Sequence, residues 1–162
     1  MTSILKVSEI QDPTNSNTAL TIDSSGRVTT PAKPAFSVTG LGSNFTIISG
    51  AETKLPFQGT PTVNVGSHYS SGTFTAPVAG VYWIQSYALI LNSGGNNATL
   101  IIKRSGLKII EGRAKNTLET QVSVEGVVSC SAGDTIEIFA GCDGSNSLLY
   151  SGYNIFNGYL IG

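Results

Sequence analysis

The sequence predicts an all-β protein, and three observations carry that prediction. Ser, Thr, Asn and Gly supply 67 of the 162 residues, an excess of small polar and turn-forming side chains. Fifteen Ile and eleven Val accompany them, and β-branched residues favour strands. From residue 35 onward, short apolar segments alternate with turn clusters, and no segment shows sustained helical periodicity.

Charge and hydropathy narrow the class of protein further. Only 12% of the residues are charged and the formal net charge is −1, so the basic surface that nucleic-acid binding requires is absent and no nucleic-acid partner is expected. The first residues lack the apolar run of a signal peptide, and no stretch reaches the roughly 18 apolar residues of a membrane span. We therefore expect no membrane partner, and synthesis in a cytoplasm.

Residues 1–34 differ from the rest of the chain. They contain three prolines and no aromatic residue, so they cannot build a core of their own and are expected to form an extended arm. Residues 4–10 alternate loosely, 19–22 form a short apolar strand, and a turn at 23–26 follows. Pro31 and Pro34 favour an extended connector. The predicted organisation is an arm at 1–34 and a domain at 35–162.

Within the domain, the clearest predicted strand spans residues 81–91. Both of its alternating faces are largely apolar, which is typical of a central strand covered on both sides. The loop at 92–97 and the turns near Gly133 and at 143–146 separate the later strands. Those further predicted strands are 98–103, 107–111, 120–131, 135–142 and 153–161.

Two cysteines, Cys130 and Cys142, leave three alternatives: a disulfide, a redox pair or two buried thiols. Both share the alternation of their apolar neighbours on successive predicted strands. A hairpin that turns near Gly133 would place Cys130 opposite position 136 or 137, away from Cys142. Because free cysteine behaves as a small apolar side chain, buried thiols are the favoured interpretation.

No catalytic constellation is apparent in the sequence. The single histidine, His68, lies in a turn-like stretch, and neither Gly-x-Ser-x-Gly, a phosphate loop nor Gly-x-Gly-x-x-Gly occurs. Asp134, Glu137 and Asp143 do not have the spacing of a calcium loop, so we interpret them as solvated turn carboxylates. The sequence predicts no enzyme, no cofactor and no metal site.

Two segments carry a more specific pattern. Residues 63–69 read Val-Asn-Val-Gly-Ser-His-Tyr, and residues 72–83 read Gly-Thr-Phe-Thr-Ala-Pro-Val-Ala-Gly-Val-Tyr-Trp. This pattern resembles the central signature of the C1q/TNF-like globular domain. The start at 35–37 and the closing segment at 153–160 resemble the first and last strands of that family, so the resemblance covers residues 35–162.

The resemblance implies a ten-stranded jelly roll that assembles as a homotrimer through apolar and aromatic strand residues. The candidates for the trimer contact are Tyr87, Tyr153, Phe156 and Tyr159, and ordinary core packing is the alternative for each. No Gly-X-Y stalk precedes the domain, and Ser70 stands where the family commonly has Asp. These departures argue against an animal complement or cytokine role.

The arm carries a second resemblance. Residues 5–11 read Leu-Lys-Val-Ser-Glu-Ile-Gln, and residues 18–29 read Thr-Ala-Leu-Thr-Ile-Asp-Ser-Ser-Gly-Arg-Val-Thr. Together they resemble N-terminal segments of virion decoration and fibre proteins of tailed bacteriophages, especially marine and cyanobacterial phages. This implies a component of the virion surface made in the host cytoplasm.

Our leading hypothesis is a trimeric capsid decoration or cement protein, with the major capsid protein or another virion protein as partner. The arm would anchor it by β-augmentation through segments 4–10 and 19–22. The expected anchoring residues are Ile4, Leu5, Val7, Ile10, Leu20, Ile22 and Val28. The alternative is the tip of a short tail fibre or spike that binds a host surface receptor through loops 92–97 and 143–147.

Overall fold

The computed structural model describes residues 5–14, 16–91, 97–115 and 119–162. The chain divides into two compact units, Met1–Lys33 and Pro34–Gly162, which we call the arm and the head. Each unit is described by itself. None of the described residues belongs to a helix long and apolar enough to cross a membrane.

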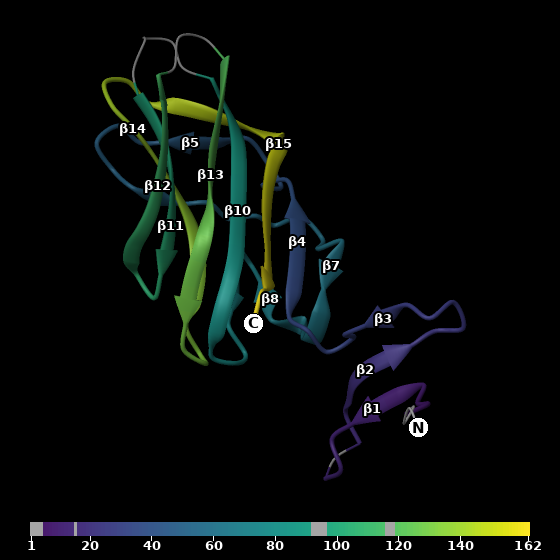
Figure 1. Cartoon of the computed structure of the whole chain (residues 1–162). Coiled ribbons are helices and arrows are strands. Elements are labelled where there is room, and N and C mark those ends of the chain that lie inside the picture. Colours follow the sequence, from purple (N-terminus) through teal and green to yellow (C-terminus); the bar gives the residue numbers. More distant parts are fainter. Residues whose placement is uncertain (1–4, 15, 92–96, 116–118) are drawn as a thin grey trace. The chain divides into compact units, whose positions relative to one another are not determined.

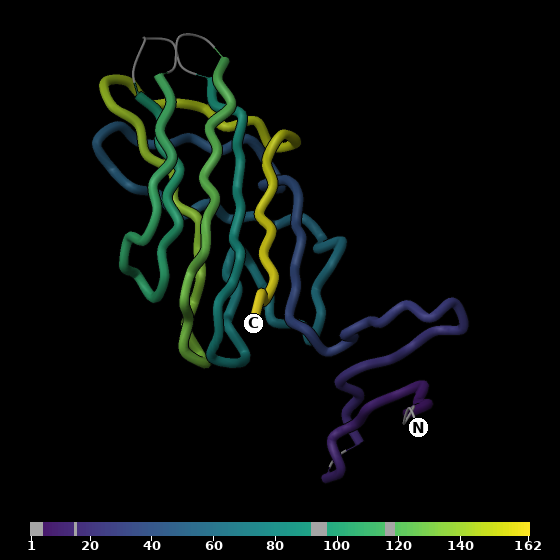
Figure 2. Tube along the Cα trace, in the orientation of Figure 1, coloured from purple at the N-terminus to yellow at the C-terminus, as the bar shows by residue number. Residues whose placement is uncertain are grey.

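The head is a sandwich of two antiparallel sheets, whose layers can be followed in Figure 1 and along the trace in Figure 2. The first sheet contains, in spatial order, β13 (Glu119–Cys130), β10 (Gly80–Leu91), β15 (Ser147–Leu160), β4 (Ala35–Thr39) and β7 (Val63–Asn64), with β5 (Phe45–Ile47) also paired to β15. The second contains β12 (Leu107–Lys115), β11 (Asn97–Arg104), β14 (Thr135–Cys142), β9 (Thr73–Thr75) and β8 (Tyr69–Ser70), with β6 (Thr53–Lys54) also paired to β14. The all-β prediction is confirmed. The described sheets hold twelve strands where ten were expected, and several of the twelve are only two residues long.

The core of the head lies between the two sheets. On β10, the even-numbered residues from Tyr82 to Ile90 are buried and the odd-numbered ones face outward, as the period of two for a strand requires. The rings of Phe36 and Phe74 stack with centroids 4.6 Å apart, and Phe156 meets Phe36 edge-on at 4.7 Å. Such aromatic pairs add to the stabilisation that burial alone provides.

The connection between β13 and β14 differs from the expected hairpin. β13 pairs with β10 in the first sheet, where Cys130 lies opposite Gly80, and β14 belongs to the second sheet. The turn that ends at Asp134 therefore carries the chain from one layer to the other. Cys130 and Cys142 are both free and buried, so the interpretation as buried thiols is confirmed. The hairpin near Gly133 that was expected to keep them apart was wrong.

The segment with the family-like signature folds around Tyr69. The side chain of Asn64 accepts a hydrogen bond from the Tyr69 backbone N–H and donates one to its C=O, both at 3.0 Å. The buried Tyr69 hydroxyl donates to the Phe57 carbonyl at 2.7 Å and accepts from the Gly72 N–H at 3.0 Å. Burial raises the pKa of Tyr69 to about 12. Gly72 has φ +77°, and a Cβ there would lie 2.6 Å from the Pro56 carbonyl oxygen, so only glycine fits.

Tyr69→Phe is expected to destabilise the head by about 1–3 kcal/mol, because it leaves two buried backbone groups without their partner. Tyr82→Phe is the matched control, since it removes a hydroxyl that donates only one bond, to the Val78 carbonyl. Urea unfolding followed by tryptophan fluorescence measures both variants. Equal losses in the two variants would contradict this account of Tyr69.

The arm is a three-stranded antiparallel meander. Its strands are β1 (Glu9–Gln11), β2 (Thr18–Ile22) and β3 (Val28–Thr29), in that spatial order. Asp23 closes the β2–β3 turn: its carboxylate accepts hydrogen bonds from the Ser25 and Arg27 backbone N–H groups, each at 2.9 Å, and forms an ion pair with the Arg27 side chain. The arm is thus a small three-stranded sheet, where the sequence predicted an extended arm.

Candidate functional site

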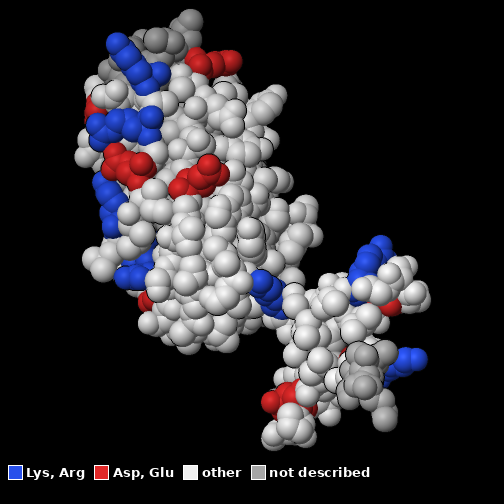
Figure 3. Space-filling view, in the orientation of Figure 1, with Lys and Arg blue, Asp and Glu red and all other residues white. Residues whose placement is uncertain are grey.

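The outward surface of the first sheet of the head is unusually poor in charge. Its three adjacent strands β10, β15 and β4 contain no Asp, Glu, Lys, Arg or His. Figure 3 views this side of the head: charged side chains gather along its border over β12, and most of the surface over β10, β15 and β4 is uncharged. A soluble protein rarely leaves so broad an uncharged sheet surface in water unless a partner covers it.

Apolar side chains from three strands meet on this surface. Trp83 on β10 lies directly between Val127 on β13 and Tyr159 on β15 in the sheet register. The Trp83 and Tyr159 rings are 5.5 Å apart, while Val127 is 57% exposed and Tyr159 46% exposed. We call this surface the β10–β15 face; its members are Val81, Trp83, Tyr87, Leu89, Val127, Ile155 and Tyr159.

A polar row crosses the middle of the β10–β15 face. Gln85 lies between Glu125 and Asn157 in the register, and its side-chain amide donates to the Glu125 carboxylate at 3.1 Å. The Asn157 side-chain oxygen is buried and has no hydrogen-bond partner within the described part of the chain. Buried acceptors are normally paired, so Asn157 is an exception within this polar row.

Three of the four predicted trimer residues lie outside the core of the protomer. Tyr87 and Tyr159 are on the β10–β15 face, and Tyr153 is 64% exposed, with its ring 6.3 Å from that of Tyr150. Phe156 instead points inward and is fully buried, because it alternates with Ile155 along β15. Its place is the core of the protomer, where no second copy reaches it.

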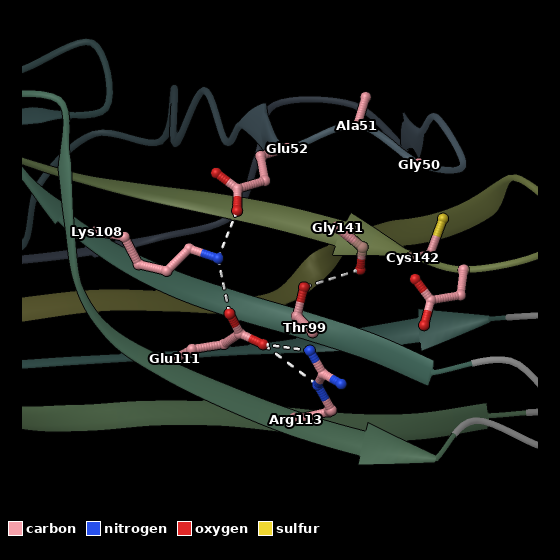
Figure 4. A pocket seen from close by; sticks show the side chains of 10 residues that line it. Gly50, Ala51, Glu52, Thr99, Lys108, Glu111, Arg113, Gly141 and Cys142 are labelled. Carbon is pink, nitrogen blue, oxygen red and sulfur yellow. Dashed lines mark hydrogen bonds and ion pairs between the residues drawn. The ribbon is translucent and has the colours of Figure 1, made fainter.

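A second cluster consists of charged side chains on the other sheet. Glu52 bridges Lys103 and Lys108, with oxygen–nitrogen distances of 2.8 and 2.6 Å, and Lys108 reaches Glu111, which pairs with Arg113. Figure 4 shows the part of this chain that runs from Glu52 through Lys108 and Glu111 to Arg113, beside a pocket of about 170 Å³. Glu52 and Glu111 are each already paired with two cations, so neither carboxylate is left unpaired for a ligand.

This ion-pair chain makes stability depend on pH. Hydrogen bonds from Lys103 and Lys108 lower the pKa of Glu52 below its ordinary 4.5, and those from Lys108 and Arg113 do the same for Glu111. A lowered folded-state pKa contributes stability above pH 4.5, and that stability is lost as the pH falls through the folded value.

We therefore expect the melting temperature to fall as the pH is lowered from 7 to below 4.5, the ordinary pKa of these carboxyl groups. The double variant Glu52→Gln and Glu111→Gln is expected to be less stable at pH 7 and to show a shallower fall. Thermal unfolding by circular dichroism across this range measures both. An unchanged slope in the double variant would contradict the assignment.

The other chemistry-bearing residues lie apart from one another. His68 follows the short 3₁₀ turn Val65–Ser67 and is half-buried. Glu137 pairs with Lys54 at 2.6 Å, and Asp134 accepts from the Ser131 N–H and the Ser105 hydroxyl. Asp143 accepts from the Asn97 side chain at 3.2 Å, which joins the ends of the two predicted recognition loops; residues 92–96 lie outside the described part.

The sheet of the arm has two unlike faces. One face is polar, and its side chains bond to one another: Thr18 to Glu9 and Gln11, and Thr21 to Thr29. The opposite face is apolar, with Ile10 beside Leu20 and Ile22 beside Val28 in the register. Ile10, Ile22 and Val28 are 46%, 37% and 61% exposed. We call Ile10, Leu20, Ile22 and Val28 the apolar face of the arm.

The remaining predicted anchoring residues lie at the start of the arm. Leu5 and Val7 are exposed and line a hollow of about 590 Å³ together with Ile22. Ile4 is outside the described residues. β2 contains the predicted pairing segment 19–22; it pairs with β1 on one side and, at Thr21 and Ile22, with β3 on the other. Among the described residues of the arm, the outer edges of β1 and β3, and the part of β2 that β3 does not pair, remain open to a further strand.

The fold of the head matches solved structures over nearly their whole length. The globular domain of a zebrafish complement 1qA protein superposes with a TM-score of 0.58 at 22% identity, over 80% of this chain and 98% of its own. Eiger TNF from S. frugiperda gives 0.63 at 10% identity, over 81% and 94%. Murine APRIL gives 0.61 at 12%, over 79% and 98%. The head therefore has the C1q/TNF-like jelly-roll fold.

The sequence matches no known protein-family profile and no curated protein. The similarity thus lies in the backbone arrangement of the head. By name, the first of these three structures is a complement protein and the second a TNF, and none of the three is named as an enzyme.

Proposed function

We propose that this chain is a non-enzymatic structural protein of a virus particle, assembled as a homotrimer of heads and attached by the arm. The heads project as capsid decoration or cement knobs. The observation that carries the assembly is the β10–β15 face, in which three neighbouring strands lack any charged residue. The resemblance of the arm to virion proteins of tailed phages supports the location.

Self-association through the β10–β15 face fits its chemistry. Trp83, Tyr159 and Val127 offer the aromatic and aliphatic area that dominates stable interfaces. The resemblance to the C1q/TNF-like domain also implies that such heads assemble as a closed threefold ring.

Attachment to the particle uses the open edges of the arm. β1 and β3 each present one unpaired backbone edge among the described residues, and an extended segment of a capsid protein can add a strand there. Main-chain hydrogen bonds then supply the affinity. This proposal places the anchoring at the outer strands β1 and β3.

Co-sedimentation of labelled full-length protein with purified tailless capsids tests the proposal. We expect saturation at hundreds of copies per particle, and loss of binding for residues 34–162, whose folding is checked by near-ultraviolet circular dichroism. Full binding without the arm would overturn arm-mediated anchoring. Failure of the full chain to bind would overturn the capsid location and favour the tail-tip alternative. Binding of the protein to host cells would then test that alternative.

A further inference from the structure

The apolar face of the arm requires a cover. A sheet with one apolar face must bury that face against another element, and a unit as short as Met1–Lys33 falls below the roughly 40 residues at which chains usually fold without disulfides, metals or oligomerisation. On the polar face, the side chains hydrogen-bond to one another, Thr18 to Glu9 and Thr21 to Thr29. The need for a partner is therefore confined to Ile10, Leu20, Ile22 and Val28.

We infer that these four residues pack against the same face of the arms of the other two copies, so that three arm sheets enclose a common apolar core. The inference rests on the proposed trimer of heads. It assigns the apolar residues of the arm to self-assembly and leaves the strand edges for the particle.

Chain connectivity favours a second copy over a foreign partner. β3 ends at Thr29 and β4 begins at Ala35, so five residues join the arm to a strand of the sheet that carries the β10–β15 face. Five residues span at most about 17 Å, and a turn shortens this link further, since the Lys33 N–H donates to the Thr30 carbonyl. Trimerised heads would thus hold three arms together at an effective concentration in the millimolar range.

The composition of the face agrees with self-packing. It contains two isoleucines, one leucine and one valine and no charged or polar side chain, so identical copies meet without like charges facing each other. If the apolar face were covered only after the chain reached a capsid, it would stay exposed to water until then, and the sheet of the arm would lack a packing partner.

Cysteine cross-linking in the full-length chain tests the inference. Ile22→Cys places a thiol on the apolar face, and Thr21→Cys, the adjacent residue, places one on the polar face. Val28→Cys and Thr29→Cys form a second matched pair on β3. The native Cys130 and Cys142 are buried, so a short bis-maleimide applied to the folded protein reacts chiefly at the introduced thiols.

We expect Ile22→Cys and Val28→Cys to give roughly ten-fold more cross-linked product than their neighbours, since the tether concentrates all four thiols equally but only those on the packed face lie close enough for a short cross-linker to join. Light scattering on the same samples reports the state of the heads. If the samples are trimeric but both members of each pair cross-link equally or not at all, the packing of the arms is overturned and the trimer of heads stands. Monomeric wild-type samples would overturn the proposed trimer and this inference together.

Discussion

Trp83→Glu is expected to leave the head folded and to convert the assembly into single chains. The substitution places a carboxylate between Val127 and Tyr159 at the centre of the β10–β15 face. An uncompensated charge buried in an interface costs about 3 kcal/mol or more, which weakens association roughly 100-fold. Light scattering at micromolar concentration measures the change in mass.

Leu107→Glu is the matched control for that experiment. Leu107 is an apolar residue, 65% exposed, at the start of β12 on the other sheet, so the same new charge there should leave the assembly intact. Dissociation by both variants would point to a general loss of stability. Retention of the full mass by Trp83→Glu would place the interface elsewhere on the head.

Phe156→Ala is expected to produce the largest loss of stability, about 3–5 kcal/mol, as for other large-to-small changes in a packed core. Phe156 is fully buried and meets the rings of Phe36 at 4.7 Å and Phe57 at 5.5 Å. Its removal leaves a cavity between the two sheets that the surrounding strands cannot close.

Tyr159→Ala, three residues along the same strand, is the contrasting variant. Its side chain is 46% exposed, so we expect little change in the stability of an isolated head and a clear weakening of the assembly. Denaturant unfolding of both variants in the Trp83→Glu background separates the two effects. A small loss for Phe156→Ala, or an equally large one for Tyr159→Ala, would contradict the assignment of faces on β15.

The sequence alone could not predict that Phe156 is buried in the core and Tyr159 exposed on the outer face. Both alternating faces of β15 carry large side chains: Phe156 and Leu160 on one, Ile155 and Tyr159 on the other. A period of two reveals that the residues separate into two sets, but not which set faces inward when both are apolar. Only the pairing of β15 with β10 and β4 settles it.

Local patterns were sufficient for the fold class and for the signature segment. The alternation along β10 and the residues Asn64, Gly72 and Tyr69 act through near neighbours in the chain, so the sequence displays them directly. The crossing between β13 and β14 was missed because a short turn looks the same whether its strands pair or separate into different sheets. Likewise, the ion pairs of Glu52 with Lys103 and Lys108 join segments whose proximity arises only from long-range sheet pairing.

The arm illustrates the same limit on a smaller scale. Its turns at 12–17 and 23–26 are visible in the sequence, and the structure places strands on both sides of each. The division into a polar and an apolar face depends on the register, which shifts between Ile10 and Gln11. Without that irregularity, a strict alternation would not bring Thr18 to the same side as Glu9 and Thr21.

Sedimentation equilibrium of the full-length chain is the most direct test of the central claim, that the β10–β15 face is covered by copies of the same protein. The account predicts a single species of three times the chain mass of 16.8 kDa at micromolar concentration. A mass of one chain at every concentration tested would contradict it.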